Sequence, residues 1–442
     1  LPNLITGKWT ATMNLTEPHA GSDLSALKTR AEPAGDHYLL KGQKIYITWG
    51  EHDMTDNIVH VVLAPMADAP PGNKGLSLFL VPKFLVNEDG SLGERNDVRV
   101  MSTEHKLGIH ASPTCVMSFG ENEGAIGYLI GDPGDGLACM FTLMNHARLE
   151  VGLQGVAISE RAYQDALGYA RERVQGRDVE TGESAAIIRH ADVQRMLMCM
   201  KSLTEAMRGL TYDGAFAHDF RIHSQNEDEK RHFNERFSLL TPLVKAWCTE
   251  LVNEVTSIGI QVHGGMGFIE ETGAAQHYRD ARISAIYEGT NGIQANDLVG
   301  RKVLRDQGAA LGSYLEEILE TAERIEHDER LKPMAVKLKD AVSNLQAASH
   351  YVIENAAGSQ KFVGAVAYNF LMMMGYVAGA WYMARAAEKA VTELDGSDKA
   401  FYERKLASVN FYFAQLLPRH RGYQEAVITG AEIGVSLNEA CF

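Results

Sequence analysis

The chain has 442 residues, enough for two to four domains of ordinary size. Asp and Glu (57) outnumber Lys and Arg (42), so the net charge is −15. This balance argues against nucleic acid or an anionic membrane as the main partner, because clustered Lys and Arg carry such binding. The five cysteines are widely spread and never form a CxxC pair, which argues against a disulfide scaffold or a thiolate zinc site. They favour a reducing compartment, and we expect a cytoplasmic location.

The chain begins with Leu-Pro-Asn-Leu-Ile-Thr-Gly-Lys-Trp, without an initiator Met. This segment lacks a basic region followed by an apolar stretch, so it is not typical of a signal peptide. The sequence is expected to be the middle of a longer protein.

Residues 1–130 are predicted to form a β-domain. His37–Thr48 alternates around a turn at Gly42, and two short β-branched or aromatic runs follow at Asn57–Ala64 and Gly75–Pro82. Pro113–Gly120 is a further candidate strand. Several short strands separated by Gly and Pro favour a small antiparallel β-barrel or sandwich.

Residues 131–305 are predicted to form an antiparallel four-helix bundle. From about residue 135 the apolar residues recur with the helical period, and a second helical stretch covers 185–216. After a charged connection around 226–231, a third long helix is expected to hold Pro242 in its first turn and to end at Gly264 and Gly265. Another helix is expected from about Asn291, and long helices of this kind pack as a bundle.

Residues 306–442 are predicted to form a separate C-terminal helical domain, with helical sequence from Ala310 to Leu437. Within it, Phe362–Ala384 has no charged residue and is long enough to cross a bilayer. We expect a buried helix instead, because this stretch is rich in Ala and Gly and carries Asn369 and three tyrosines.

Three segments hold candidate functional residues. Met13–Asp23 is a turn with clustered hydroxyls and amides, either a ligand-binding loop or an ordinary polar turn. Gln261–Gly267 lacks the GxGxxG spacing and is typical of a helix end with permissive glycines. In Ile286–Gln294, Glu288 is either a helix cap or a buried base whose pKa burial would raise. The histidines form neither HExxH nor a tight cluster, so no metal site is predicted.

Together and in this order, four motifs resemble the acyl-CoA dehydrogenase family of FAD-dependent enzymes. They are TEPHAGSD at Thr16–Asp23, KGQKIYITWG at Lys41–Gly50, QVHGGMGF at Gln261–Phe268 and RDARISAIYEGTNGIQ at Arg279–Gln294. The loop Val86–Val98 and the helices after 305 resemble a bacterial branch that includes 3-methylmercaptopropionyl-CoA dehydrogenase. Members of that branch carry further N-terminal helices, which are not in this sequence.

The resemblance implies a role for individual residues. Glu288 matches the catalytic base. Ser22 and Arg148 match substrate-binding positions, on the acyl-CoA chain and near the coenzyme A end. The FAD-binding positions are matched by Leu15, Thr16, Tyr46, Thr48, Arg173, Gln261, Gly264, Gly265 and Thr290. Among these, Arg173 and the Gln261–Gly265 segment are expected to reach the flavin of a neighbouring subunit, so the resemblance implies a homodimer or a dimer of dimers.

The implied reaction is the α,β-dehydrogenation of an acyl-CoA thioester to the trans-2-enoyl-CoA, with an electron-transfer flavoprotein as acceptor. Glu288 would take the α-proton while a hydride leaves the β-carbon for flavin N5. Two alternatives stay open at this point: an acyl-CoA oxidase that uses oxygen, and a non-catalytic relative associated with nucleic acid.

Overall fold

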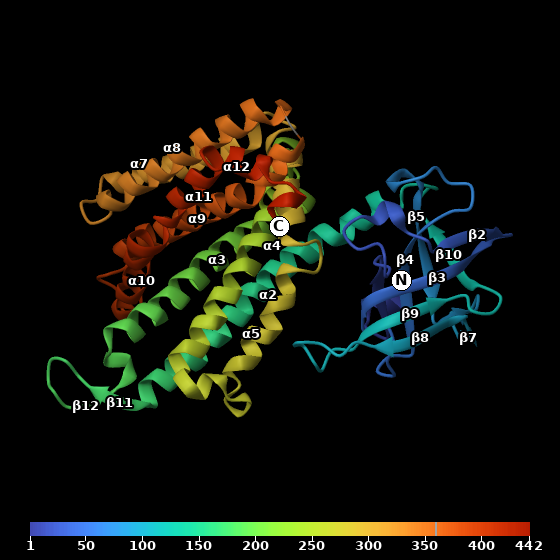
Figure 1. Cartoon of the computed structure of the whole chain (residues 1–442), viewed down its shortest axis with the longest axis horizontal. Coiled ribbons are helices and arrows are strands. Elements are labelled where there is room, and N and C mark those ends of the chain that lie inside the picture. Colours follow the sequence, from blue (N-terminus) through green and yellow to red (C-terminus); the bar gives the residue numbers. More distant parts are fainter. Residues whose placement is uncertain (359) are drawn as a thin grey trace. The chain divides into compact units, whose positions relative to one another are not determined.

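The computed structural model describes residues 1–358 and 360–442 and divides the chain into two units, Leu1–His146 and Ala147–Phe442. The secondary structure changes from strands to helices at residues 131–135, where the period of the sequence changes. Figure 1 shows the strands of the first unit in the blue to teal part of the chain and the long helices in the teal to red part. The predicted α+β class is confirmed.

An eight-stranded curled sheet dominates the first unit. Its strand order is β1-β4-β5-β10-β3-β9-β8, with β2 on β3, and a two-stranded β6–β7 sheet lies apart. The strands are β1 (Trp9–Asn14), β2 (Arg30–Ala34), β3 (His37–Thr48), β4 (Asn57–Pro65), β5 (Leu76–Pro82), β6 (Phe84–Val86), β7 (Leu92–Arg95), β8 (Val98–Thr103), β9 (Thr114–Phe119) and β10 (Ala125–Ile130). All the pairings in the main sheet are antiparallel except that of β1 with β4, which is parallel and departs from the prediction.

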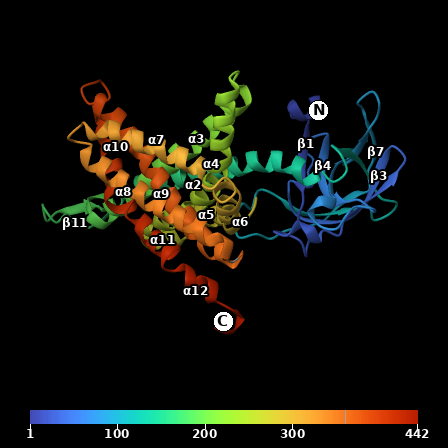
Figure 2. The ribbon, with the colours of Figure 1, turned by 90° about the horizontal axis from the view of Figure 1, so that it is seen from above.

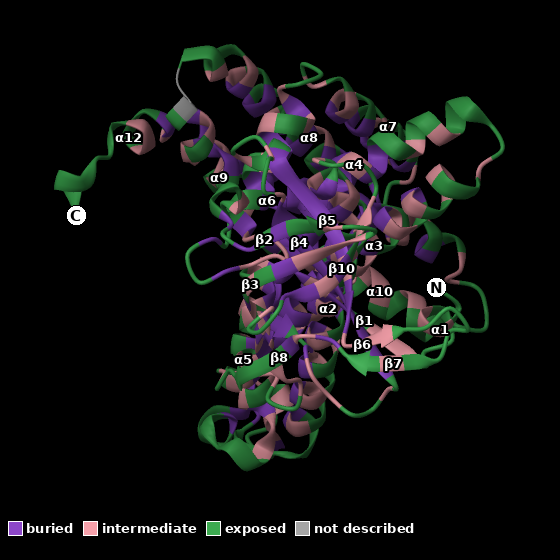
Figure 3. Ribbon diagram, turned by 90° about the vertical axis from the view of Figure 1, so that its right-hand side faces the viewer, coloured by how far each residue is buried: buried purple, intermediate pink, exposed green. Residues whose placement is uncertain are grey.

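The core of this unit lies around β4 and β5. Every residue of β4 is buried, and β5 is buried except at Leu80 (Figure 3). Strand β10 pairs with β3 over residues 125–127 and with β5 over residues 128–130, so one strand joins the two halves of the sheet and curls it.

The predicted turn at Gly42 is wrong, because β3 runs straight through this residue as one strand. The glycine is needed for a close approach instead. A Cβ at position 42 would lie 2.3 Å from Thr29 Oγ1 and 2.7 Å from Thr29 Cα. A turn and a tight contact both favour glycine, and the sequence pattern does not distinguish them.

Three long helices form the frame of the second unit: α2 (Gly136–Glu172), which begins in the first unit, α3 (Ala191–His223) and α4 (Glu227–His263). A short hairpin of β11 (Val174–Arg177) and β12 (Ser184–Ala186) follows α2, and α5 (Ala274–Arg282) and α6 (Asn291–Asp297) follow α4. The predicted bundle helices are confirmed, including the one that begins at Asn291.

Pro242 lies well inside α4 and not in its first turn, so that prediction is wrong. Helix α4 begins much earlier than expected, after its cap at Asn226, whose side chain accepts hydrogen bonds from the amides of Asp228 and Glu229 at 2.9 and 3.2 Å. This cap and the acidic residues 227–229 in the first turn explain why the segment is helix and not a charged connection.

The C-terminal helices share one buried core with α2, α3 and α4. They are α7 (Ala309–Glu326), α8 (Lys332–Asn355), α9 (Gln360–Thr392), α10 (Lys399–Phe411), α11 (Arg419–Ile428) and α12 (Ala431–Ser436). Helix α9 packs against α3 and α4 on one side and against α7 and α8 on the other (Figures 1 and 2). Two of its glycines, Gly375 and Gly379, accommodate the indole of Trp247 from α4, since a Cβ there would lie 2.2 and 2.8 Å from ring atoms.

Helix α9 contains the apolar run Phe362–Ala384. Among the described residues, Lys361–Thr392 is the one segment whose length and composition would suit a membrane span. In its most apolar window, 72% of the residues are buried inside the protein. This agrees with the expectation of a helix buried against protein.

Candidate active site

A buried ion pair fixes the loop that follows β1. Lys44 is fully buried, and its Nζ donates to Glu17 Oε1 at 2.9 Å, to the carbonyl of Leu15 at 2.9 Å and to that of Leu63 at 2.8 Å. Glu17 also accepts from the amides of Lys28 and Thr29 at 2.7 and 3.1 Å. Interior hydrogen bonds therefore hold this loop on both sides of Thr16, at the Leu15 carbonyl and at the Glu17 carboxylate.

Tyr46 lies beside this loop, because the Ile45 amide donates to the Thr16 carbonyl at 2.9 Å. The pairing of β3 with β9 shifts register between Lys44 and Ile47, and Tyr46 has a positive φ of 62°. Such a conformation is strained for a bulky residue. It leaves Tyr46 61% exposed, with Thr48 also exposed. Ser22 is exposed further along the loop.

Glu288 lies in the second unit, on the turn between α5 and α6. Its φ is 55°, again a strained value, and the residue is half-buried. The Glu288 carbonyl accepts from Arg148 Nε of α2 and from Gln294 Nε2 of α6, both at 3.4 Å. The structure thus brings Glu288 and Arg148, 140 residues apart in sequence, to one place.

Glu288 does not cap a helix, which overturns that reading of the motif. The N-cap of α6 is Thr290, whose Oγ1 accepts from the Ile293 amide at 3.2 Å. The Glu288 carboxylate is therefore not engaged in forming the helix start.

Burial and the neighbouring cations act on the Glu288 carboxyl in opposite directions. Burial raises the pKa of Glu288 above its ordinary value, while the nearby cations Arg148 and Lys245 act to lower it. Lys245, on α4, is fully buried, and burial lowers the pKa of its ammonium to about 7 although Glu288 and Glu250 act in the opposite direction. A carboxylate in such surroundings is a candidate general base.

The backbone around Glu288 is closely packed. A Cβ at Gly289 would lie 2.6 Å from Gln294 Nε2 and 3.6 Å from Arg148 Nη2, so a larger residue would displace the side chains that hold the turn. Gln294 is fully buried, and its Oε1 has no partner among the described residues. A buried acceptor without a partner, on a side chain that bonds to the Glu288 carbonyl, is typical of a site that takes a ligand donor or a water.

The remaining predicted residues lie at another end of the helices. Arg173 follows the last residue of α2, and Gln261, Gly264 and Gly265 lie at the end of α4; all four are exposed. The rings of Tyr169 and His263, 4.6 Å apart, show that these two helix ends are neighbours. Positions 148 and 173 are 25 residues apart along α2, roughly 37 Å at the rise of an α-helix.

Within the second unit, the predicted residues therefore lie in two places, the Glu288 turn and the α2–α4 end, while the loop with Tyr46 belongs to the first unit. Glu17, Lys44 and Lys245 were not predicted. A signal for Lys245 was present, since it is a lysine within the apolar stretch Leu239–Trp247. Among residues 1–358 and 360–442, no group of three or more His, Cys, Asp and Glu residues is placed to hold a metal ion.

Three family models match successive parts of the chain. The acyl-CoA dehydrogenase middle domain matches residues 12–121, the acyl-CoA dehydrogenase C-terminal domain matches 134–303, and a domain described as acetyl-CoA dehydrogenase C-terminal like matches 314–437. The 3-methylmercaptopropionyl-CoA dehydrogenase of Ruegeria pomeroyi is 46% identical over 94% of this chain and 71% of its own length. The chain belongs to the acyl-CoA dehydrogenase family.

Other members agree with this. A butyryl-CoA dehydrogenase of Syntrophomonas wolfei is 37% identical over 97% of this chain and 72% of its own length. The structure of an acyl-CoA dehydrogenase from Bacillus anthracis, complexed with FAD, has the same fold, with a TM-score of 0.77 over all of this chain and 72% of that one, at 23% identity. As a member of the acyl-CoA dehydrogenase family, the chain is an FAD-dependent oxidoreductase that acts on acyl-CoA thioesters.

The described residues of this acyl-CoA dehydrogenase fit FAD. The exposed Tyr46 beside Thr16 can present a flat apolar ring to a flavin. The exposed guanidinium of Arg173 suits a diphosphate. At Gly264 and Gly265 an added Cβ would meet no described atom within 4 Å, so the backbone there is open to a ligand.

Proposed function

We propose that Glu288 is the base of this dehydrogenase and that it removes the α-proton of a bound acyl-CoA. The observation that carries this proposal is the Glu288 carboxylate itself, half-buried on a strained turn beside Arg148 and free of any role in capping α6. Burial raises the pKa of Glu288 and so makes its carboxylate a stronger base than an exposed one.

The residues around Glu288 supply position and charge. Proton loss at the α-carbon puts negative charge on the thioester oxygen, which must meet donors that are already in place. The backbone amide of Glu288 is proposed as one of these donors. The Arg148 guanidinium, on a residue that is 6% exposed, is proposed to meet the coenzyme A end of the substrate and to favour the ionised form of Glu288.

FAD, when bound, accepts the hydride that leaves the β-carbon. The proposed holders of its flavin part are Leu15, Thr16, Tyr46, Thr48 and Thr290, and Ser22 is proposed to contact the acyl-CoA chain. The Lys44–Glu17 pair supports the flavin residues by fixing the carbonyl of Leu15. The holders of the diphosphate and adenine parts are proposed to be Arg173, Gln261, Gly264 and Gly265.

These last four residues are proposed to serve the flavin of a second copy of the chain. The roughly 37 Å along α2 between Arg148 and Arg173 supports this, because a group at Arg173 lies far from the Glu288 turn of its own chain. We therefore propose a homodimer or a dimer of dimers, in which each flavin is shared.

The proposed substrates are short linear acyl-CoA thioesters, with 3-methylmercaptopropionyl-CoA and butyryl-CoA as the first candidates. Both names come from relatives that align with most of this chain. The proposed electron acceptor is an electron-transfer flavoprotein, and the proposed location is the cytoplasm, which suits five free cysteines. Anaerobic bleaching of the flavin by a panel of acyl-CoAs ranks the substrates. Hydrogen peroxide formed in stoichiometric amount during turnover would mark an oxidase instead.

Glu288→Gln tests the base directly. Glutamine keeps the size of the side chain but lacks the basic oxygen, so the variant should keep its flavin and its acyl-CoA binding. Its anaerobic flavin reduction should fall by at least 10²–10⁴-fold, roughly the usual contribution of a positioned base. Glu271→Gln, at an exposed carboxylate, is the matched control. A flavin-replete Glu288→Gln enzyme that reduces at the wild-type rate would place the base elsewhere.

Arg173→Gln tests the shared site, with Arg177→Gln on the neighbouring hairpin as control. Loss of the guanidinium that pairs with a diphosphate should speed flavin loss on dilution, whereas substitution of Arg177, which donates to the Gly182 carbonyl, should not affect it. Light scattering on the same samples gives the oligomeric state. A monomer that retains flavin as tightly as the wild type would contradict the shared site.

A further inference from the structure

A buried network of polar side chains lies near the Glu288 turn and takes no part in the reaction described above. Lys245 Nζ donates to Asn291 Oδ1 at 3.0 Å, and Asn291 Nδ2 donates to Glu250 Oε2 at 2.8 Å. Lys245 is fully buried and Asn291 is 6% exposed. This polar network links α4, which carries Lys245 and Glu250, to the first residue of α6.

Asn291 is three residues beyond Glu288, and the turn between them is one of the strained parts of the backbone. Lys245 and Thr249 of α4 both donate to Asn291 Oδ1 and so restrain the turn from its C-terminal side. The hydrogen bond from Arg148 to the Glu288 carbonyl restrains it from the other side. A buried ammonium without hydrogen bonds or counter-charge would cost several kcal/mol, so a lysine at this point needs acceptors and anions around it.

The groups that face this region come from three helices. Arg148 comes from α2, Lys245 and Glu250 come from α4, and Glu288 and Tyr287 come from the turn before α6. Tyr287 donates its hydroxyl to Gln154 of α2. On α6, Asp297 faces Arg148. The ammonium of Lys245 uses one of its three N–H donors on Asn291 and is the cation of α4 that acts on Glu288.

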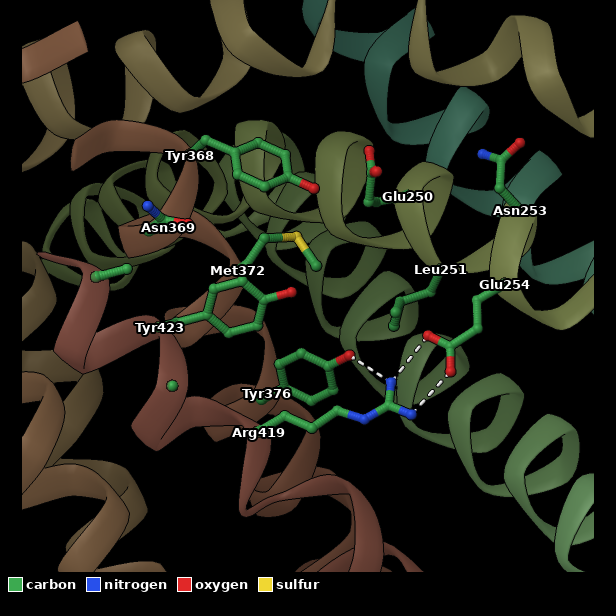
Figure 4. A pocket seen from close by; sticks show the side chains of 12 residues that line it. Glu250, Leu251, Asn253, Glu254, Tyr368, Asn369, Met372, Tyr376, Arg419 and Tyr423 are labelled. Atoms are coloured by element: carbon green, nitrogen blue, oxygen red, sulfur yellow. Dashed lines mark hydrogen bonds and ion pairs between the residues drawn. The ribbon is translucent and has the colours of Figure 1, made fainter. Parts of the chain in front are cut away.

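Glu250 extends this polar network toward a pocket. It lines a pocket of about 720 Å³ between α4, α9 and α11, together with Tyr368, Tyr423 and the Arg419–Glu254 ion pair (Figure 4). In Figure 4 the Tyr368 hydroxyl points toward the Glu250 carboxylate. The polar network therefore runs from the Glu288 turn to the edge of the C-terminal helices.

We propose that Lys245 is a positioning residue for this dehydrogenase: through Asn291 it fixes the turn that carries Glu288, and its charge keeps the Glu288 carboxylate ionised and ready to accept the α-proton. The proposal rests on Glu288 as the base. The effect of the Lys245 charge on Glu288 is separate from the effect of Lys245 on the turn through Asn291. Neither effect requires Lys245 to touch the substrate.

Three variants separate the two parts of the proposal. Lys245→Met removes the charge at nearly constant length, Lys245→Arg keeps the charge, and Asn291→Ala keeps Lys245 but removes the link to the turn. Lys302→Met is the matched control, since Lys302 is half-buried in the same region but bonds to Ser238 and faces Asp297 and neighbouring arginines.

The first measurement is the pH dependence of anaerobic flavin reduction. Loss of a nearby cation raises the pKa of a carboxylate, so the acid limb in Lys245→Met should move upward by roughly one pH unit. Lys245→Arg should restore the limb, and Asn291→Ala should lower the rate with the limb unmoved. A limb in Lys245→Met that coincides with the wild-type limb would overturn the charge role.

The second measurement needs no turnover. Urea unfolding midpoints are compared for Lys245→Met, Glu288→Gln and the double variant at about pH 6, where a Lys245 ammonium with a pKa of about 7 is still charged. If the two charges face each other, the double variant should unfold at higher urea than the sum of the single effects predicts, because Glu288→Gln removes the anion that Lys245→Met leaves unpaired. Additive midpoints would overturn the proposal. This failure is distinct from failure of the proposed base, which shows only as full activity in Glu288→Gln.

Discussion

Lys44 Nζ and Glu17 Oε1 lie 2.9 Å apart in the interior of the β-unit, beside the loop that is proposed to meet the flavin. Both side chains are almost completely buried. Burial would raise the pKa of Glu17, but Lys44, with Thr29 and Lys28, brings the pKa of that carboxyl below its ordinary value. Burial in turn lowers the pKa of Lys44 to about 8.

Lys44→Met should destabilise the β-unit strongly. It leaves Glu17 as a buried anion and removes the donor to the carbonyls of Leu15 and Leu63, and breaking a buried pair typically costs about 3–5 kcal/mol. Chemical denaturation followed by circular dichroism measures this loss. Lys41→Met, at an exposed lysine of the same strand, is the control and should stay within about 0.5 kcal/mol of the wild type.

The Lys44–Glu17 pair makes the folding stability depend on pH in both the acid and the alkaline range. Below about pH 4.5 the wild type should lose the contribution of Glu17, since a carboxyl with a lowered pKa stabilises the fold only while it is ionised. Between about pH 8 and 10.5 the unfolded chain binds more protons at Lys44 than the folded one, so stability should rise with pH. Unfolding titrations of wild type and Lys44→Met at about pH 7.5, 8.5 and 9.5 measure the second effect. Equal slopes in the two proteins would show that Lys44 is not its source.

The Thr290 hydroxyl caps α6 in the structure, and Thr290 has a second role by proposal. Thr290→Ala should cost about 0.5–2 kcal/mol, because it removes the side-chain cap of α6, and Thr290→Ser should retain most of it. If Thr290 also contacts the flavin, Thr290→Ala should alter the flavin absorption bands while Thr290→Ser leaves them unchanged. Unaltered bands in a destabilised Thr290→Ala protein would leave the cap as its only role.

Gly375→Ala should destabilise the contact between α9 and α4. The new Cβ would lie 2.2 Å from Trp247 Cδ1, and overpacking of this kind costs about 1–3 kcal/mol or more. Gly364→Ala on the same helix is the control. A Cβ there meets no described atom within 4 Å, and alanine is the better helix former by up to about 1 kcal/mol. Thermal unfolding should thus shift in opposite directions in the two variants.

Much of this fold could be predicted because periodicity is a local property of the sequence. The change from strands to helices, strands β4 and β5, and the start of α6 at Asn291 all follow from nearby residues. The roles of Lys44 and Lys245 could not be predicted, because each depends on a partner 27 or 46 residues away. The prediction for Pro242 failed for a related reason: a proline is most often found in a first turn, and the cap at Asn226 lies too far upstream to be associated with it.

The site shows the same division. Glu288 was found through its motif, while the fact that Thr290 and not Glu288 caps α6 required the backbone of the turn. The proposed residues also belong to distant parts of the chain, and only the folded helices show that Arg173 and Gln261 lie at one end.

The indole of Trp247, seated over Gly375 and Gly379, makes the protein its own optical probe. The sequence has four tryptophans, and Trp247 is fully buried, with its ring edge-on to Tyr376. Any event that lifts α9 from α4, such as cleavage of the chain between α6 and α7, would transfer this indole to water and shift its emission to longer wavelength. Fluorescence can therefore follow the attachment of the C-terminal helices in real time, without a label and without the flavin signal.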